Sequence, residues 1–239
     1  MISRGALRRA ACVAVLALGA GAAVFPAAGG EVSVSNGVEG RARIAVTSWR
    51  DMPFKTIVRQ QYDFSCGSAA VATLLTYHFE RPTTEREAFL AMYEIGDKEK
   101  IKREGFSLYE MKLYLESIGY RADGFRVTLD RLQRIGVPAI VLITWRNYKH
   151  FVVVKGVRDD HVLIGDPVRG LKVIPRDEFM TYWTDGIVFA IHNADFIAKQ
   201  HFNNEGEWKG RPRAPLPTAI SRSGLSTFSI LLPGAAELF

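Results

Sequence analysis

The strongest constraint on the fold of this chain is a change of periodicity near residue 120. Before that point, apolar residues recur at the three- and four-residue spacing of helices, as in the run from Cys66 to Phe79. After it, short apolar or alternating runs typical of strands dominate, and turn residues separate them. Helices followed by several strands in hairpin succession indicate an α+β fold, with an N-terminal helical lobe packed against a C-terminal antiparallel β-sheet lobe.

Capping signals and apolar runs define the individual elements that we expect. Thr84 with Glu87, and Ser107 with Glu110, have the spacing of capping boxes that begin helices. Helices are therefore expected at 66–79, 84–95, 107–119, 128–135 and 175–182. Strands are expected at 120–127, 138–145, 150–157, 161–165 and 186–192. The polar stretch 96–104 is expected to be a loop.

Residues 1–29 have the pattern of a secretory signal peptide. Three arginines precede an apolar stretch of about 15 residues, and small residues lead to an expected cleavage after Gly29. The apolar stretch is shorter than the roughly 20 residues that cross a bilayer. We therefore expect no membrane span after signal removal and a periplasmic mature protein; an uncleaved anchor is the alternative.

The rest of the chain is expected to form one domain with flanking segments. Residues 30–53 form a loose lead-in that is rich in Gly, Val and Arg, and residues 54–202 carry globular patterning. Residues 203–239 are rich in Pro and Gly and are expected to be a flexible tail. The apolar end of this tail, 228–232, could instead dock on the domain or on a partner.

Charge and motif content exclude several classes of function. The formal charge of +6 falls to about +3 without residues 1–29, because that segment holds three arginines and no acidic residue. The remainder mixes both signs without an arginine-rich helix, so we expect no nucleic-acid partner. It has no zinc-ligand spacing, no glycine-rich phosphate loop and no HExxH motif, so no metal or cofactor is expected.

Cys66 is the only cysteine after residue 29, since Cys12 lies in the signal peptide. It opens a helix-forming run, where the helix dipole and free N–H groups favour a thiolate. Gly67 would let a substrate backbone approach, and the Cys66 amide could point at an oxyanion. A second oxyanion donor could come from Gln60 or Gln61. A solitary cysteine is more often an inert core residue, but the residues described next favour a nucleophile.

His150 and Asp166 are the candidate partners of Cys66. His150 begins a strand that we expect to be central, and Asp166 ends the following strand, so a hairpin could bring the carboxylate to the imidazole. Each residue alone is more often a surface or turn residue. Among the other histidines, His192 is a reserve base, and His78 is expected to be a cation at a helix C-terminus.

These segments resemble a known family. Residues 60–70, Gln-Gln-Tyr-Asp-Phe-Ser-Cys-Gly-Ser-Ala-Ala, and the segment from His150 to Pro167 resemble bacteriocin-processing, double-glycine-leader cysteine peptidases. Those are papain-like domains, often fused to ABC transporters. The family places a glutamine six residues before the cysteine and an aspartate sixteen residues after the histidine, as here. The resemblance covers residues 54–192.

The resemblance implies a papain-like fold and assigns a role to four residues. Cys66 would be the nucleophile, His150 the base and Asp166 the residue that orients the imidazole. The spacing selects Gln60 over Gln61 for the oxyanion hole. The family usually has an aspartate directly before the cysteine, whereas this chain has a serine there.

The export signal indicates which members of that family the chain resembles. With that signal, the chain looks like the stand-alone members found with exported fibre, pilus or amyloid secretion systems. This implies an exported polypeptide as the substrate and secretion or assembly components as possible partners. Two alternatives remain: the same chemistry on a cell-wall amide or in an acyl transfer, and a client-binding module that keeps the fold without cleaving.

Overall fold

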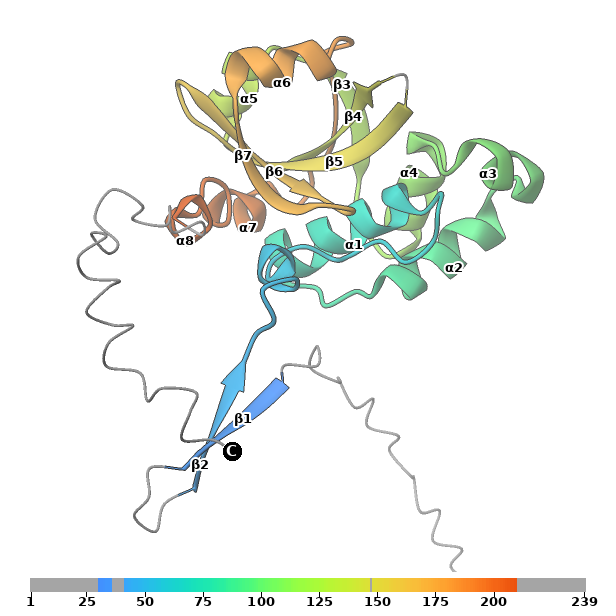
Figure 1. The fold of residues 1–239 in the computed structure, drawn as a ribbon. Helices are drawn as coiled ribbons and strands as arrows, with labels where there is room; N and C mark the ends of the chain where they lie inside the picture. The colour runs from blue at the N-terminus through green and yellow to red at the C-terminus, as the bar shows by residue number, and fades with distance from the viewer. Residues whose placement is uncertain (1–29, 36–40, 147, 210–239) are drawn as a thin grey trace, which may run out of the picture. The chain divides into compact units, whose positions relative to one another are not determined.

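The computed structural model describes residues 30–35, 41–146 and 148–209, in two compact units within residues 1–48 and 49–239 (Figure 1). The first unit contains an antiparallel pair of strands, β1 (Gly30–Ser35) and β2 (Arg41–Val46). The expectation of a loose lead-in over residues 30–53 was therefore wrong for these twelve residues. Their apolar residues alternate with polar ones in the sequence, which is the strand pattern.

The second unit begins with helices. A short 3-10 helix, η1 (Met52–Phe54), precedes α1 (Cys66–His78), α2 (Glu85–Ile95), α3 (Lys98–Glu104) and α4 (Leu108–Ser117). The expected capping boxes are present: Thr84 and Glu87 cap α2, and Ser107 and Glu110 cap α4.

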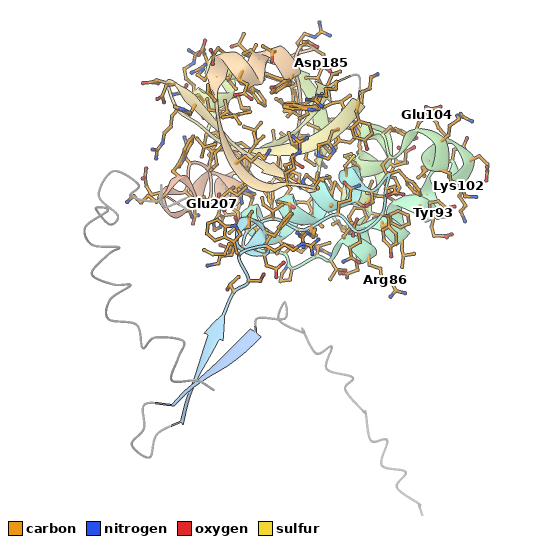
Figure 2. The ribbon with its side chains drawn as sticks, viewed as in Figure 1. Arg86, Tyr93, Lys102, Glu104, Asp185 and Glu207 are labelled. Atoms are coloured by element: carbon orange, nitrogen blue, oxygen red, sulfur yellow. The ribbon has the colours of Figure 1, made fainter. Side chains whose placement is uncertain are left out.

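The prediction of a loop at 96–104 was wrong, because α3 occupies most of it. The Asp97 side chain caps α3 by accepting hydrogen bonds from the N–H groups of Glu99 and Lys100. Ile101 is the one buried residue of α3, and Lys102 and Glu104 project from it into solvent (Figure 2). A single apolar contact leaves no periodicity in the sequence, so a cap and one core residue define this helix.

The strands form one antiparallel six-stranded sheet in the order β3-β8-β4-β5-β6-β7. They are β3 (Ala122–Arg126), β4 (Ala139–Trp145), β5 (Tyr148–Val157), β6 (His161–Asp166), β7 (Gly170–Pro175) and β8 (Ile187–Ile191). Helices α5 (Leu129–Ile135) and α6 (Arg176–Tyr182) were expected, whereas β7 was not. The predicted α+β, papain-like fold with a helical lobe and an antiparallel sheet lobe is confirmed.

Both faces of β5 are buried, which places this strand at the centre of the unit. Phe151 and Val153 pack in one apolar cluster with residues of α1, α2 and α4. Val152 and Val154 pack in a second cluster with residues of α5 and α6. The alternation follows from the two-residue period of a strand, and it fixes His150 at the start of a strand held on both sides.

The chain beyond the sheet continues in two short helices, α7 (Asp195–Gln200) and α8 (Glu205–Trp208). The ammonium of Lys155, on the buried strand β5, donates to the Thr56 carbonyl at 2.8 Å and pairs with Glu207 at 2.5 Å. Asn203 donates its backbone N–H to the Lys155 carbonyl. The expected flexible tail therefore does not begin at residue 203, because polar contacts fold residues 203–208 onto the sheet.

Removing Glu207 should destabilise the protein substantially. The Lys155 side chain is fully buried, and burial lowers its pKa while Glu207 opposes that shift. Glu207→Ala leaves a buried ammonium with one carbonyl partner, so we expect the free energy of unfolding to fall by about 3 kcal/mol. The control is Glu205→Ala, which removes an exposed pair with Arg158 and should cost less than about 1 kcal/mol. Equal losses in urea denaturation would contradict this role of the buried pair.

Two expectations fall outside the described residues. The signal peptide over residues 1–29 is one, and the Pro- and Gly-rich segment from residue 210 to residue 239 is the other. Within the described ranges, no helix is both long and apolar enough to cross a membrane.

Candidate active site

Cys66 is the first residue of α1, as the sequence predicts, and it is 7% exposed. The N–H groups of a first helical turn have no partner inside the helix, so the Cys66 amide can face an incoming oxygen. A Cβ on Gly67 would lie 2.6 Å from the Met111 side chain and 3.1 Å from Phe106. Close packing against α4 and against the segment just before α4 therefore accounts for this glycine. This packing holds the start of α1 in place.

The hairpin of β5 and β6 brings His150 and Asp166 together as predicted. The Nε2 atom of His150 lies 2.9 Å from Oδ1 of Asp166, and both side chains are buried. The same carboxylate oxygen accepts hydrogen bonds from the backbone N–H groups of Val168 at 2.8 Å and Arg169 at 3.2 Å. The turn after β6 thus fixes the carboxylate, and the carboxylate fixes one ring nitrogen.

The second ring nitrogen of His150, Nδ1, is not bound by Asp166. It is buried and makes no hydrogen bond of ordinary geometry within the described residues, yet Cys66 is close enough to act on the ring electrostatically. Burial opposes charging of the ring, but Asp166 and Cys66 outweigh burial and raise the pKa of His150 to about 9. The pKa of Asp166 is lowered: burial would raise it, and His150 and the two backbone N–H groups prevail. The ring is therefore protonated near neutral pH.

Gln60 lies next to this group, but its amide is engaged elsewhere. Its backbone N–H donates to the Pro167 carbonyl at 2.9 Å, directly after Asp166. Its side-chain nitrogen donates to the carbonyls of Tyr62 at 2.6 Å and Asp63 at 3.2 Å. Gln60 therefore lies beside the turn that follows Asp166. Its side chain must release one of these carbonyls before it can donate to an oxyanion.

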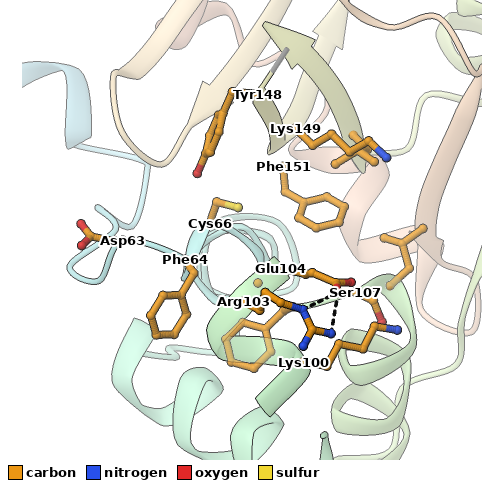
Figure 3. A pocket seen from close by; sticks show the side chains of 14 residues that line it. Asp63, Phe64, Cys66, Lys100, Arg103, Glu104, Ser107, Tyr148, Lys149 and Phe151 are labelled. Carbon is orange, nitrogen blue, oxygen red and sulfur yellow. Dashed lines mark hydrogen bonds and ion pairs between the residues drawn. The ribbon is translucent and has the colours of Figure 1, made fainter. Parts of the chain in front are cut away.

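A cleft of about 480 Å³ opens beside the cysteine (Figure 3). Its walls come from both lobes: the segment before α1, the α3–α4 region and strands β4 and β5. Tyr148 extends over it from β5, two residues before His150 and on the same face of the strand. Burial raises the pKa of Tyr148, and Cys66 adds to that shift. The sequence pattern missed Tyr148, although its spacing from His150 was a usable signal.

Comparison with known proteins decides the family. The peptidase C39 family matches residues 55–195, more than half of the chain. The chain belongs to the peptidase C39 family. Two curated relatives are named probable functional amyloid protease FapD: one from Pseudomonas fluorescens, 43% identical over 146 residues, and one from Pseudomonas aeruginosa, 42% identical over 146 residues. Each match covers 61% of this chain and 64% of the relative.

More distant C39 relatives are parts of transporters. The lactococcin-G-processing and transport ATP-binding protein LagD of Lactococcus lactis is 27% identical over 59% of this chain and 20% of its own length. A solved structure, a double glycine motif protease from an AMS/PCAT transporter in complex with the leader peptide, is 26% identical with a TM-score of 0.47. It covers 56% of this chain and 89% of that one. The predicted resemblance to bacteriocin-processing peptidases is confirmed.

A buried carboxylate near the cysteine was not predicted from the sequence of this C39 protein. Glu85, at the start of α2, is 2% exposed. Both of its oxygens lie 3.0 Å from the Gln61 backbone nitrogen, and one also accepts from the Ser65 hydroxyl. Ser65 occupies the position directly before Cys66, where the family usually has aspartate. Glu85 therefore holds both ends of the segment that joins Gln60 to Cys66.

Replacing Glu85 should weaken both the fold and the site. Glu85→Ala leaves the part-buried Gln61 backbone N–H without its acceptor, while the Ser65 hydroxyl keeps the Tyr62 carbonyl at 2.9 Å, so the free energy of unfolding should fall by about 1 to 2 kcal/mol. Glu94→Ala on the same helix is the control, since the Glu94 side chain is 70% exposed and forms an exposed pair with Lys98; it should cost about 0.5 kcal/mol or less. Urea denaturation measures both. A loss no greater than that of the control would contradict the contribution of this carboxylate.

The other histidines of this C39 protein do not join the site. His192 is paired with the partly exposed Asp123 at 2.9 Å and lines a separate hollow with Glu116 and Arg121, so the reserve base is not brought to Cys66. His78 is 1% exposed, and burial lowers its pKa well below the usual value. The expectation of a cation there was wrong, because the end of α1 is covered and the ring is neutral. Among the described residues, no group of His, Cys, Asp or Glu is arranged to hold a metal ion.

Proposed function

We propose that this C39 protein is an exported cysteine peptidase that cuts a secreted polypeptide. One observation carries the proposal: a buried imidazole whose Nε2 is held by Asp166, whose Nδ1 has no hydrogen-bond partner among the described residues, and whose pKa is raised in part by the nearby Cys66. Cys66 is the nucleophile, His150 the acid and base, and Asp166 the residue that orients the ring. This arrangement is the nucleophile, base and orienting group of thiol acyl transfer.

The reaction follows from the positions of these groups. The Cys66 thiolate attacks the substrate carbonyl carbon, and the carbonyl π electrons move to oxygen, which the Cys66 N–H can stabilise. The C–N bond then breaks as Nδ1–H of His150 protonates the departing amine, which leaves a thioester. Water attacks this thioester, His150 accepts its proton, and the acid product and the thiolate are released.

Gln60 is the proposed second oxyanion donor. Its backbone position beside Pro167 supports this role, and the two carbonyls that now hold its amide oppose it. Substrate binding would have to turn the amide toward the developing oxyanion. Removing one oxyanion-hole donor typically lowers kcat by about 10² to 10³-fold.

The client is proposed from the relatives. Two proteins that are more than 40% identical to this chain over 146 residues are named functional amyloid proteases. We therefore infer that the substrate is an exported, amyloid-forming polypeptide or a component of its secretion system. The signal-peptide pattern of residues 1–29 supports action in the periplasm after cleavage behind Gly29.

Comparison of exported proteins tests this function. Strains that carry the wild-type protein or Cys66→Ala would be compared by mass spectrometry of the new N-termini among their exported proteins. We expect a small set of cuts that depends on Cys66, and the periplasmic protein itself should begin at Gly30. Identical N-termini in both strains would reject the peptidase, and binding of a client by both proteins would then favour a recruiting module.

A direct test of the thiol needs no substrate. Cys66 beside a protonated imidazole should react with iodoacetamide at neutral pH in the folded protein, at a rate that exceeds that of an ordinary thiol such as glutathione. Mass spectrometry would follow the reaction, and the residue would be assigned by peptide mapping. A thiol that resists alkylation until the protein unfolds would rule out the nucleophile.

A further inference from the structure

A second, smaller hollow lies against the imidazole. It has a volume of about 120 Å³ and is lined by Ile143, Trp145, Tyr148, His150, Asp166, Val168 and Arg169. The large cleft includes Cys66 but not His150, whereas this hollow includes His150 but not Cys66. Tyr148 lines both hollows and stands between them. The substrate groove is therefore divided at the reacting atoms.

The chemistry of the reaction assigns the two halves. The acyl part of the substrate is bonded to the Cys66 sulfur in the intermediate, so it lies in the hollow that the cysteine lines. The departing nitrogen must receive its proton from His150, within hydrogen-bond reach of the ring. The residue that carries this nitrogen must therefore lie against His150, in the smaller hollow. This assignment rests on the proposed peptidase activity.

The walls of the smaller hollow are apolar. The Trp145 ring lies 4.6 Å from the Tyr182 ring, measured between centroids, and the Arg169 guanidinium lies 4.8 Å from the Trp145 centroid. The other charged groups are Asp166 and His150, which bind each other at 2.9 Å. A cationic side chain that entered here would lose water, approach the positive Arg169 guanidinium and find the Asp166 carboxylate already bound to His150. An apolar side chain would bury its surface against Trp145 and Val168.

We propose that this hollow is a specificity subsite for the residue immediately C-terminal to the scissile bond, and that it selects a medium-sized aliphatic side chain such as Val, Leu or Ile. Its volume of about 120 Å³ can hold such a side chain. Burying one in this pocket should give a preference of at least about tenfold over Lys or Arg at that position.

A peptide library tests the subsite. The full mature protein would be incubated with a library of synthetic peptides of random sequence, and mass spectrometry would identify the residues on both sides of each cut. We expect aliphatic residues to be enriched about tenfold directly after the cut. In Val168→Asp, which introduces a carboxylate into the wall, this enrichment should disappear and Lys or Arg should replace it. Because enrichment is a ratio within one variant, a change in overall rate does not affect it.

The matched control is Val173→Asp on β7. Val173 is also exposed, 38% against 55% for Val168, and does not line the hollow. This variant should keep the wild-type preference, and thermal unfolding would show that both variants are folded. Cuts without any preference at that position, or an unchanged preference in Val168→Asp, would overturn the subsite alone. Absence of any cutting by the wild type would reject the peptidase proposal, and the subsite with it.

Discussion

Cys66→Ala should lower the rate of peptide cleavage by roughly a millionfold, because no other group in the site can form the thioester. The substitution removes one sulfur atom from a small buried side chain that is 7% exposed. The free energy of unfolding should therefore change by about 1 kcal/mol or less. The rate would be measured on the library peptide that the wild type cuts fastest, and stability by urea denaturation. The two results together separate a chemical role from a structural one.

A buried helical residue beside the nucleophile supplies the control. Ser68, two residues further along α1, is fully buried and donates to the Ser65 carbonyl at 2.9 Å. Ser68→Ala removes one hydrogen bond near the site and should keep activity within about tenfold, while costing about 1 kcal/mol of stability. Comparable losses of activity in both variants would mean that the start of α1 is only a structural element.

Asp166→Asn should lower kcat by roughly 10³ to 10⁴-fold. The amide keeps the size of the carboxylate, but because it is neutral it cannot stabilise the imidazolium. The backbone N–H groups of Val168 and Arg169 could still bind the amide oxygen, so the turn should persist. Single-turnover kinetics with wild-type and variant protein would measure the effect on acylation. A loss below about tenfold would contradict the orienting role.

The same variant should move the alkaline limit of activity to lower pH. In the wild type, the pKa of His150 is raised to about 9, so the protonated ring needed for acylation is lost as the pH rises through that value. Without the Asp166 charge, the pKa of His150 must fall, and the alkaline limb should shift down by about 1 to 3 pH units.

The stability of the protein should depend on pH through the same histidine. The folded-state pKa of His150 exceeds the reference value of 6.5, so the stability that its charge contributes is complete below pH 6.5 and disappears toward pH 9.

The sequence predicted the parts of this site that depend on local chemistry. Two capping boxes, the helix that begins at Cys66 and the apolar runs of β4 and β5 are written in consecutive residues. His150 and Asp166 could be paired from the sequence because a hairpin joins their strands, so short-range topology determines their distance. Their roles stay predictions until the variants are measured.

The features that the sequence missed depend on contacts between distant segments. Glu85 and Ser65 meet only after α2 folds against the segment before α1, and Lys155 meets Glu207 across 52 positions of chain. His78 becomes neutral because packing covers the helix end, which no local pattern encodes. These are tertiary effects on polar residues, for which hydrophobic periodicity gives no signal.

The thiol and the imidazole come from different layers. Cys66 lies in the first turn of helix α1, and His150 lies near the start of strand β5. A small slippage of the helical layer along the sheet would therefore separate the reacting atoms while leaving each layer intact. Heat inactivation should accordingly set in several degrees below the calorimetric melting temperature. On heating, loss of peptidase activity should therefore report separation of the two layers before circular dichroism reports loss of helices or strands.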